Sequence, residues 1–304
     1  MSPAEPREER AAVGVGLMAL AVGCFTGIDT SAKWLILAGL APIQVVFVRY
    51  LVHFLIALAI TVPGRGLADF RSNAPGRQLL RSSFLFAGTI FNFFALKYLP
   101  ITLTTTMFFA APIVITLVAI PLLGEQVGRR RIAAVCTGFL GVLIVVRPWD
   151  AGFHPAIFLS FGALICASGY FLMTRMLAGV ESNATSQLWS SGLATICLAP
   201  FGIAAWVTPP DAKVVAVLVV IGTFGAVGHI LATTAHRMAD VSILAPVVYI
   251  QILLAAVVGV AVFGTWPTVW TLAGGLIIIA SGLYIWHRER AKGQLATGTA
   301  KAVR

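Results

Sequence analysis

The sequence predicts an all-α integral membrane protein of ten transmembrane helices, arranged as two inverted repeats of five helices. Of its 304 residues, 59% are hydrophobic and only 11% are charged, whereas about a quarter of the residues in a soluble domain are charged. Ten apolar stretches are each close to the ~20 residues that cross a bilayer core as a helix. Barrel strands are excluded because the stretches are too long and too uniformly apolar, and unpaired backbone groups are too costly in lipid.

The ten expected spans follow one another with short polar or Pro/Gly-rich joints between them. They cover residues 11–38, 42–62, 77–98, 101–123, 129–147, 154–178, 184–207, 212–236, 241–263 and 268–287. Residues 1–10 are expected to form a cytoplasmic tail and not a cleaved signal peptide, because many more spans follow the first one. Residues 289–304 are expected to form a second cytoplasmic tail.

The positions of Lys and Arg predict the orientation of the chain. Sixteen of the 21 basic residues fall on the side of the N-terminus: Arg7, Arg10, Arg65, Arg71, Arg77, Arg81, Arg129, Arg130, Arg131, Arg175, Arg237, Arg288, Arg290, Lys292, Lys301 and Arg304. Four lie at the opposite ends of the spans: Lys33, Lys97, Arg147 and Lys213. Because basic loops stay in the cytoplasm, both termini are predicted to be cytoplasmic, in a multi-pass protein of the cell inner membrane.

Two sets of landmarks indicate an internal duplication. At a shift of 140 residues, Ala95–Lys97 meets Ala235–Arg237, and Leu123–Glu125 meets Phe263–Thr265. At a shift of 142 residues a second set aligns: Cys24, Thr26, Gly27 and Lys33 with Cys166, Ser168, Gly169 and Arg175. Fixed-period similarity of this kind is the mark of a repeat.

The duplication divides the ten spans into five for residues 11–148 and five for residues 149–288. Because five is odd, the second copy is expected to enter the membrane upside down relative to the first. Many secondary transporters use this arrangement to build two gates around a site near the midplane.

Several strings of residues also resemble a known family. They are Ala95–Leu99, the Thr-rich turn after it, Leu123–Glu125, Ala245–Gln251, Phe263–Gly264 and Ser281–Tyr284. They are similar to the drug/metabolite transporter superfamily, in its EamA branch, over nearly the whole chain. The resemblance implies a ten-helix carrier of small metabolites. The members of the family that it points to include exporters of aromatic amino acids. Thr265 departs from the pattern, because the second repeat usually has an acidic residue there.

Four polar residues lie deep in the first two spans. Asp29 and Lys33 are four residues apart, as are Arg49 and His53, so each pair shares a helix face. Asp29 and Arg49 both lie roughly 12–15 Å below the outer joint. One interpretation is a structural ion pair between Asp29 and Arg49, with Lys33 reaching outward. The other is a substrate site, where Lys33 or Arg49 attracts a carboxylate and Asp29 meets an amino group or fixes the arginine.

Further polar and aromatic residues are candidates to line a central cavity. They are Asn92, Tyr98, Thr105 and Phe109 in the first half, and Tyr170, His229, Tyr249 and Gln251 in the second. Mixed aromatic and polar walls suit a ligand with an apolar ring and a few polar handles, and a deep histidine can relay protons. For each residue the alternative is a polar group satisfied by a neighbouring helix. Gating or hinge roles are expected for Pro112, Pro246, Gly124 and Glu125, with a plain packing kink as the alternative for the prolines.

The predicted function is secondary transport of small amphipathic metabolites by alternating access, with export of aromatic or other apolar amino acids as the leading choice. The alternatives are an uptake carrier or exchanger for another metabolite or organic cation, and, more distantly, a membrane-embedded enzyme. No nucleotide-binding loop, metal site, cofactor or nucleic-acid partner is expected. Glycines in spans five and ten permit close helix packing, which makes a homodimer conceivable.

Overall fold

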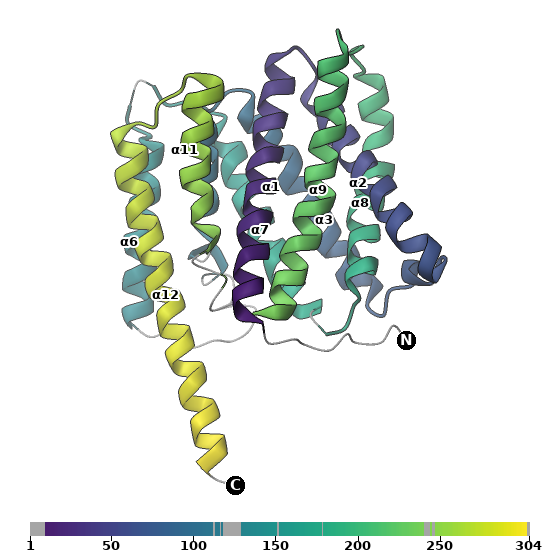
Figure 1. Ribbon diagram of the computed structural model, residues 1–304. Coiled ribbons are helices and arrows are strands. Elements are labelled where there is room, and N and C mark those ends of the chain that lie inside the picture. Colours follow the sequence, from purple (N-terminus) through teal and green to yellow (C-terminus); the bar gives the residue numbers. More distant parts are fainter. Residues whose placement is uncertain are drawn as a thin grey trace.

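The computed structural model describes residues 10–111, 113–115, 117, 129–150, 152–177, 179–239, 244 and 247–302. Within these ranges the chain is all-helical, with ten α-helices and one short 3₁₀ turn, η1 (Ala68–Phe70). Seven of the helices are long and apolar enough to cross a membrane. They stand side by side as a bundle (Figure 1).

The described helices follow the expected spans closely at seven of ten positions. In the first half they are α1 (Ala11–Leu37), α2 (Pro42–Arg65), α3 (Pro75–Leu96), α4 (Ile101–Phe108) and α6 (Arg129–Val146). In the second half they are α7 (Ile157–Leu177), α8 (Asn183–Ala204), α9 (Ala212–Met238), α11 (Ile250–Phe263) and α12 (Val269–Ala302).

The expected continuous helix over residues 101–123 is wrong. Helix α4 ends at Phe108, and the next two N–H groups, of Phe109 and Ala110, bond to carbonyls only three residues back, at 3.2 and 3.1 Å. Helical backbone resumes at Ala111. The sequence supplies the reason: Pro112 stands four residues after Phe108, and in an unbroken helix its ring would clash with the Phe108 carbonyl.

The expected continuous helix over residues 241–263 is interrupted as well. Residues 247–248 are helical, Tyr249 lies in a turn, and α11 begins at Ile250. At its other end α11 stops at Gly264, whose φ of +63° is the left-handed conformation that glycine adopts without strain. The fourth span of each half is therefore a broken helix.

Helix α12 continues well past the tenth expected span. It runs to Ala302 and projects beyond the bundle, so most of the expected C-terminal tail is helical (Figure 1). The start of α1 and the end of α12 lie at the same end of the bundle.

Most of the packing joins helices of different halves. The most extensive contacts are α1 with α9, α3 with α7, α6 with α12 and α2 with α8, and α4 also contacts α11. The core between them is apolar, with Tyr50, Phe93 and Leu35 among its largest fully buried side chains. The two halves thus share one interior.

At both ends of the bundle, hydrogen bonds join the loops that flank α8 to the first half of the chain. At one end the buried Gln44 amide donates to the Val207 carbonyl at 2.8 Å and accepts from the Val207 N–H at 3.0 Å. At the other end the Glu181 carboxylate accepts from the Ala74 N–H at 2.8 Å and from the Ser72 hydroxyl. Helix α8 is therefore tied to the first half at both of its ends, to the start of α2 at one and to the start of α3 at the other.

Helices α6 and α12 pack through glycine. A Cβ built at Gly274 would lie 2.6 Å from the Gly141 carbonyl oxygen, and the Ser281 hydroxyl donates to the Ala134 carbonyl at 2.6 Å. These close approaches lie within one chain, so these glycines give no support to the expected homodimer.

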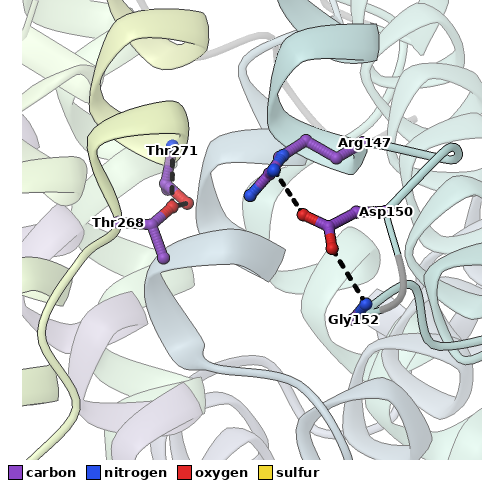
Figure 2. A network of polar contacts seen from close by, with 5 residues as sticks. All are labelled: Arg147, Asp150, Gly152, Thr268 and Thr271. Carbon is purple, nitrogen blue, oxygen red and sulfur yellow. Dashed lines mark hydrogen bonds and ion pairs between the residues drawn. The ribbon is translucent and has the colours of Figure 1, made fainter.

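Figure 2 shows the end of the α6–α12 pair where α6 finishes. Arg147 pairs with Asp150, whose carboxylate accepts from the Gly152 N–H at 3.1 Å, and the Thr268 and Thr271 hydroxyls are 2.9 Å apart. The Arg147 guanidinium also lies over the Trp270 ring, 4.8 Å from its centroid. These contacts cap the ends of two helices and lie apart from the interior polar residues.

Candidate functional site

Polar and ionisable side chains gather inside the bundle, between α2, α3, α7, α8 and α9. We call this group the interior cluster; its members are Arg49, His53, Arg81, Tyr170, Gln187, Ser190 and His229. Ionisable groups at membrane depth are costly and are normally kept for function.

Arg81 is the part of the cluster that the protein itself satisfies. It is 3% exposed and donates from Nε to Thr174, from Nη1 to Ser190 and from Nη2 to Tyr170, at 2.8, 2.9 and 3.0 Å. The acceptors are neutral oxygens of α7 and α8. Arg81 therefore joins three helices and keeps its positive charge uncompensated by a carboxylate.

The two histidines lie next to each other. The rings of His53 and His229 are stacked, with centroids 5.8 Å apart and planes 11° apart. His53 Nε2 is 3.1 Å from the Gln187 amide oxygen, and Tyr170 packs edge-on against His229. No three His, Cys, Asp or Glu side chains gather at metal-binding distance in the part of the chain that the structure describes.

Asp29 and Arg49 do not form the expected ion pair among the described residues. Asp29 accepts from the Asn92 amide at 2.9 Å, while the Arg49 guanidinium lies over the Tyr50 ring, 4.4 Å from its centroid. The two charges are near enough to interact electrostatically. The interpretation as a direct ion pair is therefore wrong for the described residues, in which the Asp29 carboxylate is hydrogen-bonded to the Asn92 amide instead.

Lys33 reaches outward, as one interpretation expected, but it is buried. Its Nζ donates to the Leu99 carbonyl at 2.5 Å, in the turn between α3 and α4, and lies 5.5 Å from the centroid of the Phe263 ring. Lys33 thus joins α1 to the ends of α3 and α11.

The two helix interruptions meet. Phe109, in the turn that ends α4, and Tyr249, in the turn before α11, have ring centroids 5.1 Å apart. Thr105 is buried in α4, and Gln251 is partly buried at the start of α11. Phe109 and Tyr249, predicted from the fourth and ninth spans, therefore come together at a second place in the interior.

Tyr98 lies elsewhere. It is 51% exposed and stacks on His154 at the end of the bundle, with ring centroids 5.1 Å apart. The predicted gating residues lie outside the described residues: Pro112, Pro246, Gly124 and Glu125.

Sequence reasoning missed several members of the cluster. Arg81 was counted among the basic residues that set the orientation of the chain. Its position inside the expected span 77–98 could have marked it as an interior residue. Gln187 and Ser190 offered no comparable signal in the sequence, because a single amide or hydroxyl in an apolar span is common.

Comparison with known proteins places the chain in a family. The EamA-like transporter family matches residues 12–147 and, a second time, residues 154–286. This chain belongs to that family. It is therefore a multi-pass membrane transporter, and the EamA assignment made from the repeat motifs is confirmed.

Two named relatives and one solved structure are similar over most of their length. A riboflavin transporter of Brucella anthropi is 25% identical over 92% of this chain and 100% of its own. An S-adenosylmethionine uptake transporter of Rickettsia bellii is 24% identical over 91% of this chain and 94% of its own. A crystal structure with 18% identity superposes with a TM-score of 0.55 over 87% of this chain and 94% of that one, which shows a shared fold.

Proposed function

We propose that this EamA-family transporter is a secondary carrier of the inner membrane that moves small amphipathic metabolites by alternating access around its interior. The observation that carries the proposal is the interior cluster: buried arginines, histidines and amides in a membrane transporter, contributed by both halves of the chain. Such groups normally face a substrate or ion pathway.

We also propose ten spans arranged as two inverted repeats, residues 11–148 and 149–288. The family's two matches divide the chain at the same joint. The helix contacts support the symmetry, because α1 packs on α9 as α7 packs on α3, while α2, α4 and α6 pack on their counterparts α8, α11 and α12.

The two broken helices are the proposed moving parts. Short or interrupted helices at matching positions of two repeats mark the binding region of many secondary transporters. Their breaks meet at Phe109 and Tyr249, each three residues along the chain from a predicted hinge residue, Pro112 or Pro246. By contrast, α8 is tied to the first half at both ends, and with α2 it is the proposed fixed frame.

The proposed substrates combine a ring with polar handles. Aromatic amino acids are one such class, and the relatives' names add riboflavin and S-adenosylmethionine, which also join a ring system to a polar chain. Export was the prediction from the resemblance. A relative named as an uptake transporter favours uptake as the second candidate.

Counterflow in proteoliposomes tests the proposal. Vesicles are loaded with an unlabelled compound and the labelled one is added outside, using phenylalanine, tryptophan, riboflavin and S-adenosylmethionine in turn. We expect a transient accumulation of at least one label above that in protein-free vesicles. No accumulation of any compound across a broad metabolite panel would contradict the proposal.

A further inference from the structure

Among the side chains that the structure describes, three cationic ones are buried within helices, and two of them donate hydrogen bonds to the protein. Lys33 donates to a backbone carbonyl and packs on an aromatic ring. Arg81 donates from all three of its nitrogens. Each of the two therefore has at least one acceptor within the protein.

Arg49 differs from both. It is 3% exposed, and its Nε and Nη1 are buried without an acceptor among the described residues. Its contact with Tyr50 is with the ring face, which leaves the N–H groups of Nε and Nη1 unused. A buried guanidinium with unused donors needs an anionic partner, because burial of an unpaired charge is costly.

No carboxylate among the described residues fills this role. Asp29 is the only acidic residue within the described α-helices up to His287, and it accepts from Asn92 instead of pairing with Arg49. The surroundings add positive charge, because Arg49 and Arg81 both lie close enough to His229 to interact with it electrostatically.

The neighbouring helix presents only backbone to the guanidinium. Gly225 of α9 faces it: a Cβ built there would lie 3.8 Å from Nε and Cζ of Arg49 and 3.6 Å from Nδ1 of His53. His53 Nδ1 is itself buried without a partner among the described residues. Two unused polar groups therefore meet beside a residue without a side chain.

We propose that Arg49, next to His53 and the bare backbone of Gly225, binds the oxyanion group of the substrate, a carboxylate or phosphate. This inference rests on the transport function proposed above and adds the chemistry by which the substrate is held. A guanidinium suits such groups because its planar N–H donors match two oxygens at once.

The test uses simple anions, so that it does not depend on the natural substrate. Benzoate and phenyl phosphate are titrated against the purified protein in detergent, and binding is followed by ligand-observed NMR. We expect saturable binding of at least one anion, weakened at least about 10-fold by Arg49→Gln, as for the loss of a charge-assisted hydrogen bond. Benzylamine, with the same ring and the opposite charge, should show no such dependence on Arg49.

Gly225→Ala keeps the test valid if Arg49→Gln fails to fold. The added methyl group makes only ordinary contacts, so the variant should fold, yet it covers the guanidinium edge and should weaken anion binding. Gly16→Ala is the matched control, because a Cβ there meets nothing within 4 Å; it should bind anions as the wild type does. A purely structural role for Arg49 would leave anion binding by Gly225→Ala unchanged.

Two results would overturn the inference: no saturable binding of either anion by the wild type, or equal binding by wild type, Arg49→Gln and Gly225→Ala. Counterflow separates it from the proposed function. If Arg49→Gln transported at the wild-type rate, the proposed anion site would be refuted while the proposed carrier function would stand. Arg49-dependent anion binding without counterflow of any metabolite would support the site and contradict the carrier.

Discussion

The packing of α6 against α12 makes a quantitative prediction for Gly274→Ala. The new Cβ would lie 2.6 Å from both the Gly141 carbonyl oxygen and Cγ2 of Val145, and 3.0 Å from the Val145 nitrogen. Ordinary contact between carbon atoms is at ~3.5–4.0 Å, so the helices must separate by roughly 1 Å. Two of the three neighbours are backbone atoms, which cannot rotate away.

This separation would loosen the hydrogen bond from Ser281 to Ala134 and the packing of the fully buried Ile278. Overpacking typically costs about 1–3 kcal/mol, and the gain in helix propensity from glycine to alanine offsets up to about 1 kcal/mol. We therefore expect a net loss of about 1 kcal/mol in the free energy of unfolding. Thermal unfolding of the purified protein in detergent measures the change.

The matched control is Gly16→Ala, which has the same gain in propensity and open space around the new methyl group. It should be as stable as the wild type or slightly more stable. If Gly274→Ala were as stable as Gly16→Ala, the close approach of α6 and α12 would be wrong.

Three other substitutions test hydrogen bonds between different helices and loops, two of them between the halves. Asn92→Ala removes the amide that donates to Asp29, and should cost about 1.5–3 kcal/mol of unfolding free energy, as for hydrogen bonds to charged groups; unchanged thermal stability would contradict that bond. Gln44→Leu leaves the N–H and the carbonyl of Val207 without partners, and should cost about 2–6 kcal/mol at ~1–3 kcal/mol for each group; a stable variant would mean that water replaces the amide. Glu181→Ala unties the loop between α7 and α8 from the loop between α2 and α3, and should speed limited proteolysis there; wild-type cleavage rates would refute the tie.

The sequence was sufficient for most of the helices, because hydrophobic length alone marks a span in lipid. It also identified Asp29, Arg49 and His53 as interior residues, since charges at that depth must face the bundle interior. The broken helices were harder to predict. Pro112 and Pro246 were recognised as kinks, but hydropathy runs on without change through a break, so the two spans were predicted as continuous.

The partners of the interior residues could not be predicted. Asp29 and Arg49 lie at matching depth, which suggested an ion pair, yet depth does not tell how far a helix is rotated about its axis. Arg81 bonds to residues of α7 and α8, and only the packing of one half against the other brings them together. The repeat indicates that such packing exists without giving the contacts.

Alternating access to the interior cluster is the central claim, and labelling of a single cysteine tests it most directly. Gly225→Cys places a thiol beside Arg49 and His53, in a protein whose four native cysteines are replaced by alanine. A membrane-impermeant maleimide is then added to one side or the other of oriented vesicles. We predict labelling from both sides, because the same site opens to each side in turn. Labelling from one side only, or from neither, would contradict alternating access at this site.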